Sequence, residues 1–76
     1  MTLRELEIGK SGRIVSIGGD RALRRRLLDM GLTPRTAVTV RNAAPMGDPL
    51  ELRLRGYSLT LRLEDAETIT IEEDAP

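Results

Sequence analysis

The spacing of leucines between positions 50 and 63 is the clearest pattern in the chain, and it predicts a β-hairpin. Leucine occupies every second position on both sides of Gly56–Tyr57, at 50, 52 and 54 and again at 59, 61 and 63. A period of two places these side chains on one face of two paired strands. A two-residue type II′ turn favours Gly at its first central position. Such a turn would set Leu54 opposite Leu59, Leu52 opposite Leu61 and Leu50 opposite Leu63, with Glu51 opposite Arg62 and Arg53 opposite Thr60 on the other face.

A helix is predicted from Asp20 to about Met30. The Asp20 carboxylate is suited to accept a hydrogen bond from a free amide at the start of the helix, and Gly31 is suited to end it in a left-handed conformation. At 100° per residue, Leu23, Leu27 and Met30 form one narrow stripe. We therefore expect this stripe to face the core.

Leu28 lies off this stripe, with Arg24 on one side and Arg21 and Arg25 on the other. A helix that packs through the stripe should leave Leu28 largely in water. One interpretation is a single exposed leucine, or one that a neighbouring loop covers, which is common in soluble proteins. The other is an apolar anchor for a partner protein, surrounded by arginines. Met46, near the tip of the loop 43–49, is either part of a lid over one end of the fold or a second apolar contact point.

Shorter patterns predict the remaining elements. Thr2 and Glu5 have the capping-box spacing of a single helical turn. Residues 13–17 are rich in β-branched side chains whose alternation is imperfect, which indicates a strand with a bulge or one buried on both faces. Residues 33–36 form a turn, and 37–42 form a half-buried strand. After the hairpin, residues 64–67 should form a helical turn and 68–72 a last strand.

These elements predict a mainly β protein, a small SH3-like barrel of five to six antiparallel strands with one inserted α-helix and short helical turns. No connection is long enough for a parallel crossover, and closing a short sheet removes its exposed edges. An OB-like barrel is the second choice. The 76 residues contain no linker, so we expect a single domain over 1–76. No apolar run is long enough to span a membrane, which favours a cytoplasmic protein.

The composition excludes several kinds of chemistry. The chain has no Cys, His, Phe or Trp, which excludes zinc fingers and Ser–His or Cys–His hydrolases. Gly9–Lys10–Ser11 resembles the end of a phosphate-binding loop, but Arg4 stands where that motif needs its first Gly. No nucleophile has a plausible base beside it. We therefore expect no enzyme, no catalytic or cofactor-binding residues and no metal ligands, and we expect the acidic C-terminal residues to form a solvated face.

Charge is balanced overall but unevenly placed, with 12 basic and 12 acidic residues. Arginine dominates residues 21–41, whereas residues 64–76 carry only acidic charge. Because Arg suits bidentate binding of carboxylate or phosphate, we predict a partner-binding surface on the helix face. Its residues are Arg21, Arg24, Arg25 and Leu28, extended by Met46. Nucleic acid is a less favoured partner, because the stacking aromatics that such barrels use are reduced here to Tyr57.

Three motifs carry a resemblance to a known family. They are Leu23-x-x-x-Leu27-Leu28-Asp29-Met30-Gly31-Leu32-Thr33-Pro34, Ala44-Pro45-Met46-Gly47-Asp48-Pro49-Leu50-Glu51 and Arg55-Gly56-Tyr57-Ser58-Leu59-Thr60-Leu61-Arg62. In this order they resemble the FeoA family, small cytosolic components of bacterial ferrous iron uptake. The likeness extends from Leu3 to about Ile71. The family commonly has Gly where this chain has Arg35, which predicts a type I turn or mild strain there.

The resemblance implies an SH3-like barrel and a non-catalytic accessory role in ferrous iron transport. The implied partner is the FeoB permease, through its cytosolic GTP-binding domain or its membrane-proximal region. The resemblance implies no cofactor and no small-molecule substrate. It also implies a cytoplasmic protein recruited to the inner face of the membrane, where the arginines could contact anionic headgroups.

Two alternatives stay open at this point. One is an SH3-like nucleic-acid-binding module, which should bind with a steep salt dependence. The other is a relative of the C-terminal domain of iron-dependent repressors. Because no helix-turn-helix precedes the predicted barrel, the sequence favours a free-standing protein over a repressor domain.

Overall fold

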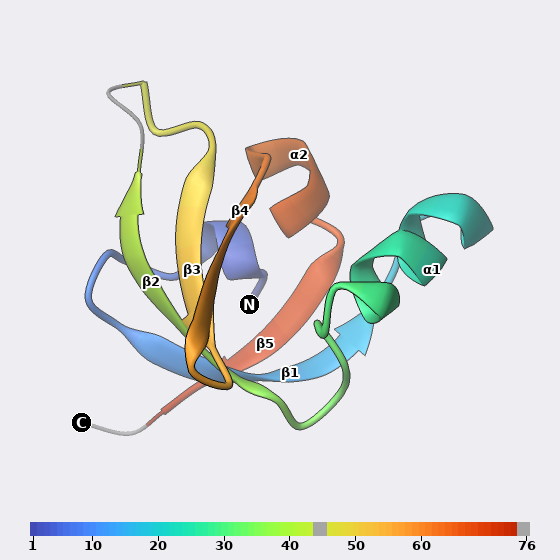
Figure 1. Cartoon of the computed structure of the whole chain (residues 1–76), viewed down its shortest axis with the longest axis horizontal. Helices are drawn as coiled ribbons and strands as arrows, with labels where there is room; N and C mark the ends of the chain where they lie inside the picture. Colours follow the sequence, from blue (N-terminus) through green and yellow to red (C-terminus); the bar gives the residue numbers. More distant parts are fainter. Residues whose placement is uncertain (44–45, 75–76) are drawn as a thin grey trace.

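The computed structural model describes residues 1–43 and 46–74, and these form a mainly β fold (Figure 1). The elements in chain order are the 3₁₀-helix η1 (Leu3–Glu5), β1 (Ser11–Ile17), α1 (Arg21–Asp29), β2 (Ala37–Ala43), β3 (Leu50–Leu54), β4 (Tyr57–Leu61), α2 (Leu63–Ala66) and β5 (Ile69–Glu73). The strands make one antiparallel sheet in the order β4-β3-β2-β1-β5. The predicted mainly β class with one inserted helix is therefore confirmed.

The core is aliphatic and draws on nearly every element. Its fully buried side chains include Leu3, Leu27, Leu32, Val38, Val40, Leu52 and Ile69. The curved sheet wraps around these residues, and η1, α2 and the loop after α1 close the open sides (Figure 1). Because the buried core of the described residues contains no aromatic ring, its stability rests on close packing of aliphatic side chains, and each buried leucine contributes a large share.

The β3–β4 hairpin forms as predicted, but the predicted register is wrong by two residues. Leu52 pairs with Leu59 and Leu50 pairs with Leu61. The turn consists of Arg55 (φ 50°) and Gly56 (φ 83°) instead of Gly56 and Tyr57. Positive φ at both central residues is the type I′ geometry, whose twist matches that of the flanking strands. A shift by two keeps leucine facing leucine, so the hydrophobic pattern could not exclude it.

The new register changes the polar pairs and the end of the hairpin. Glu51 faces Thr60 and Arg53 faces Ser58, so the predicted pair of Glu51 and Arg62 does not form. Arg62 lies instead 3.7 Å from the Glu64 carboxylate. Leu63, predicted as a strand residue, is the first residue of α2, because the Asp48 carboxylate accepts a hydrogen bond from its amide at 3.0 Å.

The first residues of the chain form the predicted capping box of η1. The Thr2 amide donates to the Glu5 carboxylate at 2.7 Å, as the capping-box spacing predicts. This bond, together with one from the Thr2 hydroxyl, lowers the pKa of Glu5.

The predicted irregularity of β1 is a β-bulge between Ile14 and Ser16, which leaves Val15 exposed.

Helix α1 has the predicted caps. The Asp20 carboxylate accepts from the Leu23 amide at 2.8 Å, and Gly31 adopts φ 99°. Leu27 is fully buried, while Leu23 and Met30 are half-buried against the core. None of the helices in the described residues is long and apolar enough to cross a membrane.

The turn at 33–36 keeps a left-handed residue despite having Arg in place of Gly. Arg35 has φ 74°, and the Thr36 amide donates to the Thr33 carbonyl at 3.1 Å. With Pro34 at the first central position, this is the type II geometry, so the expectation of a type I turn is wrong and that of strain is correct. The turn therefore adopts the type II geometry without the glycine that suits its third position.

Replacing Arg35 with Gly should stabilise the protein by about 0.5–1 kcal/mol. The strain energy relieved in the folded state should exceed the entropy that the more flexible glycine adds to the unfolded chain. Urea unfolding followed by circular dichroism would measure the change. Arg55→Gly is the matched control, since Arg55 also has positive φ but donates to the Thr33 and Thr36 hydroxyls at 3.0 Å each. There, lost hydrogen bonds should cancel the gain, and equal stabilisation at both positions would contradict the strain argument.

Candidate functional site

The exposed face of α1 carries the cationic surface that the sequence predicted. Arg21, Arg24 and Arg25 are all exposed. Arg24 is steadied by a hydrogen bond from its Nε to the Ile17 carbonyl at 3.3 Å. Within residues 1–43 and 46–74, neither Arg21 nor Arg25 forms an ion pair. These two guanidinium groups are therefore available to carboxylates or phosphates of another molecule.

The other two predicted members of this surface are placed differently from expectation. Leu28 is half-buried and packs against the core, so the prediction that it lies largely in water is wrong. Met46 is 90% exposed. Figure 1 shows its loop, between β2 and β3, on the side of the molecule away from α1, so Met46 does not extend the α1 surface. The structure thus brings together the three arginines and the exposed edge of Leu28.

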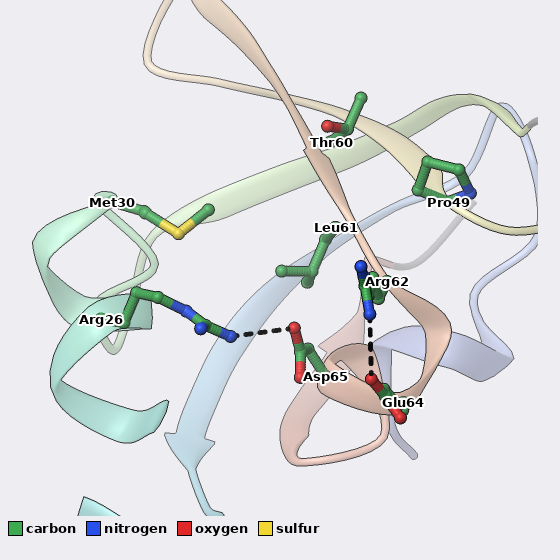
Figure 2. Close-up of a pocket in the computed structure, with 8 residues that line it drawn as sticks. All are labelled: Arg26, Met30, Pro49, Thr60, Leu61, Arg62, Glu64 and Asp65. Atoms are coloured by element: carbon green, nitrogen blue, oxygen red, sulfur yellow. Dashed lines mark hydrogen bonds and ion pairs between the residues drawn. The ribbon is translucent and has the colours of Figure 1, made fainter. Parts of the chain in front are cut away.

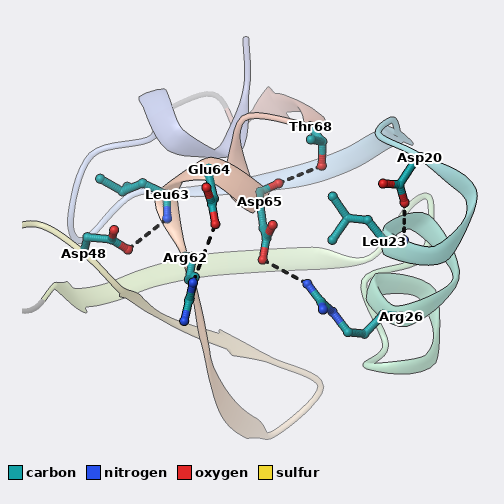
Figure 3. Close-up of polar contacts among 9 residues, drawn as sticks. All are labelled: Asp20, Leu23, Arg26, Asp48, Arg62, Leu63, Glu64, Asp65 and Thr68. Atoms are coloured by element: carbon teal, nitrogen blue, oxygen red, sulfur yellow. Dashed lines mark hydrogen bonds and ion pairs between the residues drawn. The ribbon is translucent and has the colours of Figure 1, made fainter.

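Ion pairs join the basic and acidic parts of the chain, as Figure 3 shows for α1 and α2. Arg26 Nη2 lies 3.3 Å from the Asp65 carboxylate, whose side chain is only 15% exposed. Arg4 of η1 pairs with Glu67 just beyond α2. Because these contacts neutralise Arg26 and Arg4, the free positive charge of α1 is concentrated on Arg21, Arg24 and Arg25.

A groove of about 570 Å³ lies beside this helix, between α1 and β4 (Figure 2). Arg26 and Met30 line one side, and Thr60, Leu61 and Arg62 line the other. The Arg26–Asp65 pair spans the end nearest α2. Sequence reasoning missed this groove because its walls come from α1 and β4, two segments that are far apart in the chain.

The described residues show no cluster of metal-ligating side chains. They contain no group of three or more His, Cys, Asp or Glu side chains placed to hold a metal ion. Nor do they contain a buried side-chain polar atom without a hydrogen-bond partner. The features of the described surface that suit recognition are therefore the α1 arginines and the groove.

Comparison with known proteins identifies similar sequences. The family model of the FeoA domain matches residues 1–73. A fusion protein of Fe(2+) transport protein A and Fe(2+) transporter FeoB from Porphyromonas gingivalis is 39% identical over 72 residues. That match covers 95% of this chain but only 8% of the fusion protein, so the chain spans a small part of this relative.

Solved structures extend the comparison to the fold. An FeoA-like protein from Clostridium acetobutylicum has a TM-score of 0.92 and 39% identity, covering 100% of this chain and 88% of that one. FeoA from Stenotrophomonas maltophilia, solved with zinc and described as a procaryotic SH3 domain protein, has a TM-score of 0.83 and 26% identity, covering 95% and 89% of the two chains. The second structure confirms the predicted SH3-like class.

A manganese-dependent transcriptional repressor shares the fold at a TM-score of 0.88 with 16% identity, over 96% of this chain and 36% of the repressor. At that identity the likeness concerns the fold alone. The match to the FeoA domain over residues 1–73 and the identities near 40% concern the sequence as well. The chain belongs to the FeoA family.

Proposed function

We propose that this protein is a non-catalytic accessory protein of ferrous iron uptake that binds the cytosolic part of an FeoB permease. The observation that carries the proposal is the Porphyromonas gingivalis relative, in which a segment 39% identical to this chain is fused to FeoB. Proteins that are fused in one organism commonly act together when they are separate. A fused accessory segment works within reach of the permease, and this supports our proposal that the protein acts at the inner face of the membrane.

The α1 arginines are the surface that we propose for this contact. They are exposed, they lie on one short rigid helix, and Arg21 and Arg25 form no ion pair among the described residues. Leu28 contributes its half-exposed edge between them. Guanidinium groups around a partly apolar centre suit a partner surface in which carboxylates surround a shallow hydrophobic depression.

An amide NMR titration tests both the partner and the surface. The labelled protein is titrated with the cytosolic domain of FeoB from the same organism, loaded with GDP or with a GTP analogue. Shifts clustered on residues 20–32 support the proposal, and a difference between nucleotides adds regulation by the GTPase state. If neither form causes shifts, the cytosolic domain is not the partner. Shifts with RNA or DNA instead would favour the nucleic-acid alternative.

Reversing the charge of Arg25 should weaken the binding of the FeoB domain by about tenfold or more, because one attractive pair becomes a repulsive one at the centre of the contact. Arg25→Glu would be compared with Arg41→Glu, an exposed position on β2 outside the proposed surface. Isothermal titration calorimetry measures both affinities, and circular dichroism verifies that both variants fold. Equal affinities for the two variants would move the contact away from α1.

A further inference from the structure

The two edge strands of the sheet, β5 and β4, differ in whether another segment of the chain covers them. At β5, the Met1 carbonyl accepts a hydrogen bond from the Ile71 amide at 2.8 Å, and Thr2 forms a β-bridge with Thr70. The N-terminal residues thus cover that edge. At β4, the opposite edge of the sheet, the described residues supply no such covering segment. An uncovered strand edge is a template for pairing with another extended chain.

The hairpin register fixes which main-chain groups face outward from β4. Leu54 and Tyr57 flank the two-residue turn, so they form a hydrogen-bonded pair, and so do Leu52 with Leu59 and Leu50 with Leu61. The amide and carbonyl groups of Ser58 and Thr60 therefore point away from β3. Among the described residues, no other segment forms a backbone hydrogen bond with either of them.

The groove between β4 and α1 adjoins this outer edge. Thr60, Leu61 and Arg62 form its β4 wall, and Arg26 and Met30 form the α1 wall. Pro49, Glu64 and Asp65 complete the lining, so its apolar part consists of Met30, Leu61 and Pro49 (Figure 2). Its volume of about 570 Å³ is enough for several residues of an extended chain. A strand added next to β4 would place every second side chain into the groove, over Leu61 and Met30.

The charges on the outer face of the hairpin indicate which side chains an added strand should turn outward. The outer face of the hairpin carries Arg53 opposite Ser58. Arg62, which lies just beyond the end of β4, borders both this face and the groove and is 3.7 Å from the Glu64 carboxylate. Both arginines are exposed, and Arg53 forms no ion pair among the described residues. Carboxylates on the outward face of an added strand would lie near these guanidinium groups.

We propose that the outer edge of β4 binds an extended segment of a partner protein as an added antiparallel strand, with apolar side chains turned toward Leu61 and Met30 in the groove and acidic side chains turned outward. Main-chain hydrogen bonds to Ser58 and Thr60 hold the segment, and the alternating side chains select it. The proposal does not depend on FeoB, because it concerns a different surface from the α1 arginines and a different mode of recognition.

Hydrogen exchange of the labelled full chain, followed by NMR, tests the proposal with a seven-residue synthetic peptide in which valine alternates with glutamate. In the free protein, the Ser58 and Thr60 amides should exchange rapidly, while those of Leu59 and Leu61 exchange slowly. Saturating peptide should slow exchange at Ser58 and Thr60 by about tenfold or more, with little change at their neighbours. This alternation is specific to a strand that pairs with β4.

Modified peptides identify the mode of binding. When the segment runs antiparallel to β4, the glutamates lie directly opposite Ser58 and Thr60 and exchange both main-chain hydrogen bonds with them, so the glutamate amides point toward β4. Methylating the glutamate amides should abolish binding, whereas methylating the valine amides should preserve it. Replacing glutamate with lysine should weaken binding. Equal binding of the two methylated peptides, or no protection at millimolar peptide, overturns the proposal. Concentration-dependent protection without peptide would assign the edge to a second copy of this chain.

Discussion

Replacing Gly31 with alanine is expected to destabilise the protein by about 2–3 kcal/mol, the sum of left-handed backbone strain and a lost hydrogen bond. Gly31 ends α1 with φ 99°, which side chains tolerate poorly. A Cβ atom at this position would also overlap the hydroxyl group of Tyr57, which donates to the Met30 carbonyl. Urea unfolding gives the free energy directly.

The double variant with Tyr57→Phe separates the two causes. Tyr57→Phe alone should cost about 1 kcal/mol, the hydrogen bond to the end of the helix. In that background the overlap is absent, so Gly31→Ala should cost only about 1–2 kcal/mol for the backbone conformation. Additive effects of the two substitutions would show that the Tyr57 hydroxyl does not contact position 31 in solution.

Leu27→Ala is expected to have the largest effect of the substitutions considered, a loss of about 2–5 kcal/mol. Leu27 is fully buried, and it is the buried residue of α1 that fixes the helix to the core. A domain of this size has a total stability of only about 4–11 kcal/mol, so this loss is a large fraction of it. Thermal and urea unfolding should both show the change.

Leu28→Ala is the matched control, since it removes the same atoms one position along the helix. Because Leu28 is half-buried, its replacement should cost less, about 1 kcal/mol, and leave the fold intact. Equal losses for Leu27→Ala and Leu28→Ala would mean that α1 packs through a different face. The folded Leu28→Ala variant also tests whether the exposed edge of this leucine contributes to FeoB binding.

The helix and hairpin illustrate what sequence patterns can determine. Asp20 and Gly31 fix the ends of α1 through local backbone chemistry, so both were predictable. The hairpin register was not, because pairings that differ by two residues have the same hydrophobic pattern. The type I′ turn is selected partly by Arg55, whose guanidinium reaches Thr33 and Thr36, more than 15 residues away in the chain.

The candidate site was predictable to the same limited degree. Helical periodicity placed Arg21, Arg24 and Arg25 on the surface, because charged side chains stay in water. It failed for Leu28, since the position of a residue on a helical wheel contains no information about what packs beside the helix. The groove and the uncovered edge of β4 depend on contacts between distant segments, so no local pattern marks them.

The pairing of β1 with β5 has a consequence for how the chain folds. Gly12 lies opposite Glu73, so the contact joins residues from nearly the two ends of the sequence. The β3–β4 hairpin can form as soon as its own residues are available, whereas the β1–β5 ladder must wait until the last strand has been synthesised. During translation, β1 therefore has one unpaired edge until β5 leaves the ribosome, and truncation before residue 69 would leave that edge open permanently.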